Sequence, residues 1–92
     1  MALTIEWDPQ KARVNLAKHR VSFEEAATVM GDPLSLTIQD LLHPKQEQRF
    51  VTIGQSHRGR TLVVVHSDRS ERIRIISARI ASRGERKQYE EE

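Results

Sequence analysis

The sequence predicts an α+β domain in which two helices pack on one face of a largely antiparallel sheet. Three observations support this fold class. Residues 3–7 alternate between apolar and polar, as in a half-buried strand. Two helical segments with N-cap signals follow. Strand-like segments then come at 34–39, 48–56, 61–67 and 71–78. The length of 92 residues suits one hydrophobic core, so residues 1–92 are expected to form a single domain.

The two N-terminal helices are predicted from their boundaries. Asp8 followed by Pro9 is typical of a helix start, and this helix is expected to end near Arg20. Ser22 and Glu25 have the spacing of a capping box for the second helix. Its expected core stripe is Phe23, Ala26, Ala27 and Met30, with Gly31 just past its end and Asp32-Pro33 as its stop.

The C-terminal half reads as a meander followed by a helix. Short turns around Arg58-Gly59 and 68–70 join the last three strand segments, which predicts antiparallel pairing. Ser82 and Glu85 repeat the capping-box spacing and predict a short helix that ends near Tyr89. The expected order is therefore β-α-α-β-β-β-β-α. Trp7 lies between a strand and a helix cap and is expected in the core rather than in a binding surface.

Composition excludes several classes of protein. The chain has no cysteine, which rules out disulfides and thiolate metal sites. No apolar run approaches the roughly 20 residues that span a bilayer, and the opening MALTIEWD lacks the pattern of a signal peptide. We therefore expect a cytoplasmic protein without a membrane partner.

Charge is distributed unevenly along the chain. Residues 1–44 contain four basic and six acidic residues, whereas residues 45–88 contain eleven basic and four acidic ones, a net 11 − 4 = +7. Most of the basic residues there are arginines, whose planar fork binds phosphate in a bidentate manner. This asymmetry fits a polyanionic partner, or equally an arginine-rich sheet face that is simply solvated.

The segment ERIRIISARI at 71–80 places arginines among isoleucines. Alternation along a strand puts Arg72 and Arg74 on the face opposite the core, but would turn Arg79 inward, where an unpaired charge is costly. A β-bulge at Ile75-Ile76 would return Ser77 and Arg79 to the face of the other two arginines. Alternatively, the strand ends near Ser77 and Arg79 belongs to a turn.

Three motifs that occur together in order make the chain resemble a known family. They are W-D-P-x-K from Trp7, K-H-x-V-S-F from Lys18 and R-I-I-S-A-R ending at Arg79. The chain resembles the BrnT toxins of bacterial type II toxin–antitoxin modules over nearly its whole length. That resemblance implies a RelE-like ribonuclease fold and metal-independent RNA cleavage. It also implies a hetero-oligomer with a BrnA-type antitoxin that neutralises the toxin, and a complex that represses its own promoter through the antitoxin.

Metal-free RNA cleavage requires cations for the phosphate oxygens, an acceptor for the 2′-hydroxyl proton and a donor for the leaving oxygen. By resemblance to the family's ending motif, Arg79 is the first candidate for a phosphate clamp, and Arg49 is the second. Arg49 alternatively forms a rim ion pair with Glu47 or Glu71. Further RNA-binding candidates are Lys18, His19, Arg60, Arg72, Arg74 and Arg83. No cofactor and no metal site are expected, since Asp40-x-x-His43 is too weak a pattern for a metal.

Acid–base candidates are few, and each has a structural alternative. His66 follows Leu62 and Val64 on one strand face, so it is either a packed, hydrogen-bonded histidine or a catalytic group. Glu71 either accepts a proton or pairs with Arg72. His19 either contacts RNA or is a cation placed favourably at a helix C-terminus. His43 and His57 lie in expected loops without a spaced partner.

Together with these patterns, the resemblance to the BrnT toxins implies a metal-independent endoribonuclease toxin that an antitoxin holds inactive. The alternative is a non-catalytic nucleic-acid-binding or co-repressor subunit, which the lack of an obvious general base favours. No helix-turn-helix stands out, however, because the joint at 20–22 is capped like a corner between core helices. Strands with few aromatic residues also argue against base-stacking readout of single-stranded RNA.

Overall fold

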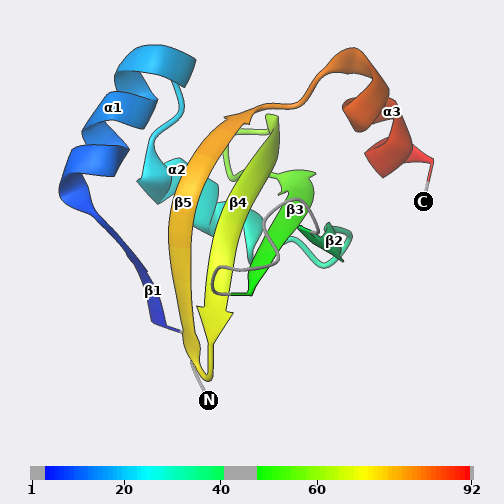
Figure 1. Ribbon diagram of the computed structural model, residues 1–92. Coiled ribbons are helices and arrows are strands. Elements are labelled where there is room, and N and C mark those ends of the chain that lie inside the picture. Colours follow the sequence, from blue (N-terminus) through cyan, green and yellow to red (C-terminus); the bar gives the residue numbers. More distant parts are fainter. Residues whose placement is uncertain (1–3, 41–47, 92) are drawn as a thin grey trace.

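The computed structural model describes residues 4–40 and 48–91, and in these ranges it has five strands and three helices (Figure 1). The strands are β1 (Thr4–Trp7), β2 (Leu36–Gln39), β3 (Arg49–Gln55), β4 (Thr61–Arg69) and β5 (Arg72–Ile80). The helices are α1 (Pro9–His19), α2 (Phe23–Val29) and α3 (Arg83–Glu90). None of these helices has the length and apolar character needed to cross a membrane.

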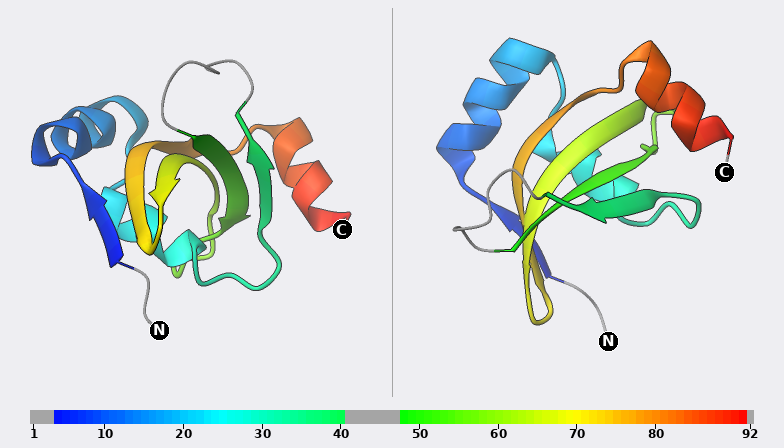
Figure 2. Two further views of the ribbon diagram at one scale, coloured as in Figure 1. Left: turned by 60° about the horizontal axis from the view of Figure 1, so that its bottom comes forward. Right: turned by 45° about the vertical axis from the view of Figure 1, so that its right-hand side comes forward.

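The five strands form one sheet in the order β1-β5-β4-β3-β2. Strands β2 to β5 pair antiparallel, which confirms the predicted meander, whereas β1 pairs with β5 in parallel through residues 72–75. The mixed α+β class is thus as expected, with one parallel pair that the sequence pattern did not reveal. Both views in Figure 2 show α1 beside β5, and the chain enters α1 directly from β1.

Asn15 connects α1 to the part of β5 that lies beyond β1. Its side-chain amide donates to the carbonyl of Ala78 at 2.8 Å and to that of Val21 at 3.0 Å, and its carbonyl accepts from the Ala78 N–H at 3.1 Å. The amide therefore replaces the neighbouring strand that β5 lacks at this point, satisfying buried backbone groups that would otherwise be unpaired. This contact fixes α1 against the sheet.

The hydrophobic core lies between α2 and one face of the sheet. Phe23, Ala26 and Val29 of α2 are fully buried, and Ala27 and Met30 pack around them, as the predicted stripe requires. Their partners on the sheet are Leu62, Val64, Ile75 and Ala78. Trp7 is partly buried against this core, with its ring edge-on to Phe23 at a centroid distance of 6.0 Å.

The helix boundaries follow the predictions, with two corrections. Asp8, Ser22 and Ser82 each cap a helix through their side chains, but only the box of Ser82 and Glu85 is reciprocal. The Glu25 carboxylate does not reach back to Ser22, because it is bonded to Arg60 instead. Helix α2 also ends without a left-handed residue, since Gly31 has no positive φ; the left-handed cap is Arg20 of α1, with φ of 59°.

Strand β5 contains the bulge expected at Ile75-Ile76. His66 pairs with Ile75 and the preceding Val65 pairs with Ser77, so Ile76 is an extra residue opposite β4. The parity of side chains changes there, which places Ala78 in the core and Arg79 outside it. Strand β5 continues to Ile80, so the alternative in which it ends near Ser77 is wrong.

Candidate functional site

The sheet face turned away from α2, called the open face below, carries the arginines in cross-strand rows. Arg49 pairs with Ser67, Ser67 with Arg74, and Arg74 with Glu6, so these four residues form one row across β3, β4, β5 and β1. Directly opposite residues share a face of the sheet. Two arginines therefore flank Ser67 in the sheet, and Ser67 is itself buried.

Arg72 extends this cluster by two residues along β5. It donates to Glu6 Oε1 at 3.3 Å, while Arg74 lies 3.6 Å from Glu6 Oε2. Both guanidinium groups are well exposed, at 70% and 46%, so these ion pairs are weak and solvent-screened. A pocket of about 240 Å³ lies here, lined by Glu6, Ser67, Arg69, Arg72 and Arg74. A bound anion could therefore displace the Glu6 carboxylate from these arginines at a small cost in free energy.

Arg79 stands apart from this cluster. It pairs with Val63, four residues from Ser67 on β4, which places it roughly 14 Å along the strand from Arg74 at about 3.4 Å per residue. Its Nη1 and Nη2 donate to Glu85 Oε1 and Oε2, both at 2.8 Å. These hydrogen bonds outweigh burial and lower the pKa of Glu85 to about 2, so the carboxylate is a poor base at neutral pH.

His66 lies on the core side of the sheet, within a chain of hydrogen bonds. Its Nδ1 is 2.6 Å from Asp68 Oδ1 and its Nε2 is 2.7 Å from Thr52 Oγ1, which in turn is 2.8 Å from Thr37 Oγ1. The ring also stacks on Phe50 at 6.0 Å. Because the histidine and Thr52 are buried, this geometry matches the packed, hydrogen-bonded alternative for His66.

Glu71 is exposed in the turn between β4 and β5, next to the left-handed Ser70. Its backbone carbonyl accepts from the Thr4 N–H at 2.9 Å, which anchors β1. Among the described residues, the carboxylate paired with Arg72 is that of Glu6 rather than Glu71. Arg49 is half-buried at the start of β3, and Glu47, its other expected partner, lies outside the described residues.

Lys18 and His19 lie at the end of α1, beside β5. They line a groove of about 370 Å³ together with Lys11, Val14, Asn15, Ile76 and Ser77, among other residues. The groove thus runs from the basic end of α1 to the bulge of β5, and Ser77 belongs to the open face. The structure therefore places these two cationic candidates next to the sheet but on a different element from the arginine rows.

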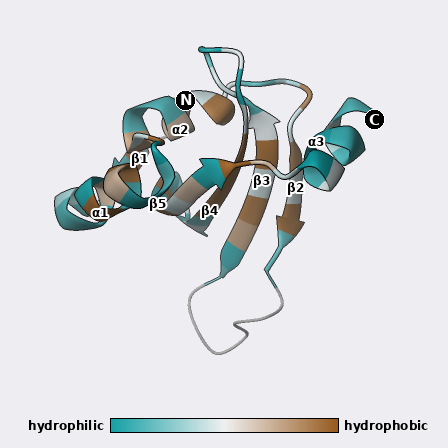
Figure 3. Cartoon of the chain, turned by 90° about the horizontal axis from the view of Figure 1, so that it is seen from above, coloured by the Kyte–Doolittle hydropathy of each residue, from teal (hydrophilic) through white to brown (hydrophobic). Residues whose placement is uncertain are grey.

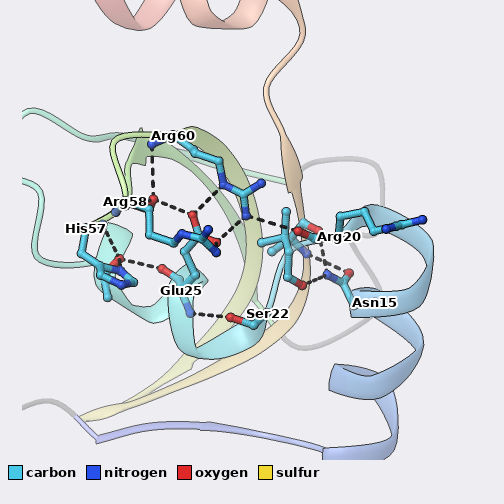
Figure 4. A network of polar contacts seen from close by, with 11 residues as sticks. Asn15, Arg20, Ser22, Glu25, His57, Arg58 and Arg60 are labelled. Atoms are coloured by element: carbon cyan, nitrogen blue, oxygen red, sulfur yellow. Dashed lines mark hydrogen bonds and ion pairs between the residues drawn. The ribbon is translucent and has the colours of Figure 1, made fainter.

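Arg60 holds a buried carboxylate (Figure 4). Its Nε donates to Glu25 Oε2 at 2.9 Å, and its Nη2 donates to Glu25 Oε1 and to the Arg20 carbonyl. Ser56 Oγ donates to the same carboxylate at 2.7 Å. Mainly through the Arg60 hydrogen bonds, the pKa of Glu25 falls to about 2 although burial opposes this. Arg60 is therefore a structural partner of α2.

The remaining candidates are dispersed. Arg83 begins α3 and is exposed, and His57 is exposed with its backbone N–H bonded to Thr28 Oγ1 at 2.9 Å. His43 lies outside the described residues. Across the part of the chain that the structure describes, no three histidine or acidic side chains gather in a way that would hold a metal ion.

Two acidic residues at the arginine sites were not singled out by sequence reasoning. Glu6 pairs with two arginines because β1 lies parallel to β5, and this long-range pairing has no local signal. Glu85 was identified only as part of a capping box. Glu85 also pairs with Arg79, and the capping box could have indicated this. A helix capped at Ser82 turns its third residue back toward the end of the preceding strand, where Arg79 lies.

Comparisons with known proteins identify the family and a similar fold. Residues 7–85 match the family model described as the ribonuclease toxin BrnT of type II toxin–antitoxin systems. The 1.1 Å crystal structure of the Brucella abortus ribonuclease toxin BrnT is similar, with a TM-score of 0.67 and 25% identity, covering 89% of this chain and all of that one. A comparison with curated proteins finds no match. Since the family model spans most of the chain, the protein belongs to the BrnT family of ribonuclease toxins of type II toxin–antitoxin systems.

Proposed function

We propose that this protein is a metal-independent endoribonuclease with a RelE-like fold that acts in the cytoplasm and cleaves RNA along the open face of its sheet. The observation that carries the proposal is the cross-strand row in which Arg49 and Arg74 flank Ser67, on a chain of the BrnT family. Exposed arginines in register are suited to the backbone of a single strand, whose phosphates they bind in a bidentate manner.

The reaction uses the 2′-hydroxyl of the RNA as the nucleophile. Its oxygen attacks the neighbouring phosphorus, the bond from phosphorus to the 5′-oxygen breaks, and a 2′,3′-cyclic phosphate and a 5′-hydroxyl form. A base removes the 2′ proton, an acid protonates the 5′-oxygen, and cations stabilise the phosphorane oxygens. The chemistry therefore needs fixed positive charge beside the phosphate more than it needs a metal.

The roles divide between two positions on β5. Arg79 is the proposed clamp for the reacting phosphate, while Arg72 and Arg74 hold phosphates of the flanking nucleotides. The positions of Arg79 and Arg74 are roughly 14 Å apart along the strand at about 3.4 Å per residue, which supports this division because the two side chains then serve different phosphates. Arg49, in the same cross-strand row as Arg74, adds a cation at the Arg74 position. Lys18 adds positive charge beside Ser77, and His19 lines the same groove.

Glu71 is the better exposed of the two acid–base candidates, but it lies at the opposite end of β5 from Arg79. It is exposed beside Arg72, whereas His66 is buried with both ring nitrogens hydrogen-bonded. A base must reach the 2′-hydroxyl. Arg72 pairs with Arg69, six residues along β4 from the Val63 that pairs with Arg79, so Glu71 lies roughly 20 Å from Arg79 and serves only a phosphate held at the Arg72 end of β5. Arg60 is omitted from the RNA surface because Glu25 occupies it.

The partner is an antitoxin, as the family's description as one half of a type II system implies. We propose that a BrnA-type antitoxin binds the toxin as a hetero-oligomer, blocks cleavage and brings the complex to its own promoter. Promoter DNA would then be contacted through the antitoxin. The toxin contributes the arginine surface that both RNA and an acidic antitoxin segment fit.

Incubation of the purified protein with RNA in the presence of EDTA tests the proposal. Cleavage is expected to continue under chelation and to leave cyclic phosphate ends, and antitoxin added at equal concentration should stop it. Loss of activity that magnesium restores would contradict metal independence. RNA that is bound but never cut would favour the alternative of a non-catalytic co-repressor subunit, and so would normal growth of bacteria that express the protein alone.

A further inference from the structure

The contact between Arg79 and Glu85 uses only one edge of the guanidinium group. The two terminal nitrogens, Nη1 and Nη2, each donate to one oxygen of Glu85 at 2.8 Å, and the other hydrogen of Nη1 points to the Ile80 carbonyl at 3.4 Å. A guanidinium has five N–H donors in a rigid plane. The edge formed by Nε and the second hydrogen of Nη2 has no partner among the described residues.

Arg60 shows the opposite arrangement in the same protein. It binds Glu25 through Nε and Nη2. In Arg60 the carboxylate therefore occupies the same guanidinium edge that no described residue occupies in Arg79. In that pair Glu25 is buried and Arg60 is 30% exposed, whereas Arg79 has 44% of its side chain exposed. The two arginine–glutamate pairs therefore differ. Glu25 occupies the Nε–Nη2 edge of Arg60, whereas Glu85 leaves that edge of Arg79 available to a second bidentate ligand.

Glu85 is itself held in place by contacts that do not involve the hydrophobic core. Its Oε1 also accepts from the Ser82 N–H at 2.8 Å, and α3 buries none of its side chains. Figure 3 shows α3 as a mostly hydrophilic helix beside β3 and β2. At its far end the Tyr89 hydroxyl donates to Asp32 Oδ2 at 2.7 Å. Such a helix adds little apolar burial, so fixing the direction of Arg79 is a function that its position supports.

We propose that Glu85 is a positioning residue for RNA cleavage: it holds the Arg79 guanidinium so that the Nε and Nη2 edge meets the non-bridging oxygens of the reacting phosphate. This inference rests on the proposed ribonuclease function and adds a residue to it. The carboxylate does not touch the substrate. It removes the rotational freedom of a long, exposed side chain before the phosphate arrives, and a clamp that is already oriented stabilises the transition state better.

Single-turnover cleavage of RNA by two matched variants tests this role. Glu85→Gln keeps the size of the side chain but loses the charge-assisted fork, and kcat should fall about 10- to 100-fold while KM changes little. Ser82→Ala weakens the same helix cap without altering the carboxylate, and should cleave like the wild type. In the Arg79→Ala background, Glu85→Gln should have no further effect on kcat, because there is no guanidinium left to position.

The outcomes separate this inference from the proposed function. An unchanged kcat for Glu85→Gln in a protein whose Arg79→Ala variant is inactive overturns the positioning role alone. An increase in kcat also overturns it, since Glu85 would then be a competitor of the phosphate. Equal losses for Glu85→Gln and Ser82→Ala would make the role one of helix capping.

A binding measurement covers the case in which no RNA is cut. A short RNA methylated at its 2′-oxygens should shift the Arg79 Nε–H resonance of the wild type in an NMR titration, and should do so several-fold more weakly in Glu85→Gln. No shift of that resonance at saturating RNA overturns the inference, whatever the protein does to cleavable RNA.

Discussion

Replacing Arg60 by alanine should destabilise the protein strongly, because it leaves Glu25 buried without its main partner. The carboxylate is 3% exposed and would keep Ser56 Oγ at 2.7 Å and the distant Arg58, at 3.9 Å, as its contacts. Breaking a buried ion pair by removing one partner costs about 3–5 kcal/mol. Because 30% of the Arg60 side chain is exposed, the lower end of that range is appropriate.

The pKa of Glu25 gives a second route to the same magnitude. It falls from an ordinary 4.5 to about 2, chiefly through the Arg60 hydrogen bonds. At about 1.4 kcal/mol per pKa unit this is on the order of 3 kcal/mol. Since the folded-state pKa is the lower one, the stabilisation is complete above about pH 4.5 and is lost as the pH falls toward 2. A domain of this size loses about 4–8 °C of melting temperature per kcal/mol, so Arg60→Ala should melt about 12–24 °C below the wild type.

Thermal melting of Arg60→Ala beside Arg58→Ala, at pH 7 and at pH 3, measures both effects. Arg58 is the matched control, since it lies 3.9 Å from the same carboxylate but is 65% exposed, and its loss should cost under about 1 kcal/mol. The gap between the wild type and Arg60→Ala should narrow at pH 3, because Glu25 is then largely protonated in the unfolded state and much of its pH-dependent stabilisation of the folded wild type is lost. Melting temperatures of the two variants within a few degrees of each other at pH 7 would refute this account of Glu25.

Three further predictions concern the site and the packing. Arg79→Lys should lose nearly as much cleavage rate as Arg79→Ala, about 100- to 1,000-fold, because a point charge cannot replace a bidentate fork. Single-turnover assays beside melting curves test this, and a lysine variant with a near-normal rate would contradict it. Arg72→Ala and Arg74→Ala should mainly weaken RNA binding and reduce the slope of log affinity against log salt by about 0.7 each, as titrations at several salt concentrations would show; an unchanged slope would mean that neither residue contacts a phosphate. Gly54→Ala should lower the free energy of unfolding in denaturant by about 1–3 kcal/mol, because its Cβ would lie 2.8 Å from Val29 Cγ1. The control Gly84→Ala has nothing within 4 Å of its Cβ and should not lower stability. Equal stability of the two variants would show that α2 and β3 move apart without a measurable cost.

Local signals in the sequence determined most of the secondary structure. Capping residues such as Asp8, Ser22 and Ser82 are short-range devices, because a side chain bonds to backbone only two or three residues away. The doubled isoleucine at 75–76 was likewise sufficient to predict the bulge, since the alternation of charge and apolarity fails there and only a change of parity keeps Arg79 out of the core.

Only the tertiary structure decided which charges meet. Glu25 has the spacing of a capping-box residue, but Arg60 lies 35 positions away and competes successfully for its carboxylate. Glu6 reaches Arg72 and Arg74 because β1 crosses over to pair in parallel with β5, 66 positions along the chain for Arg72. A charged side chain pairs with whatever the fold brings near it, and that depends on strand order and register rather than on neighbours in sequence. The sequence alone therefore determined that the open face is rich in arginine, while the fold determined that Arg60 pairs with Glu25 and that Arg79 pairs with Glu85.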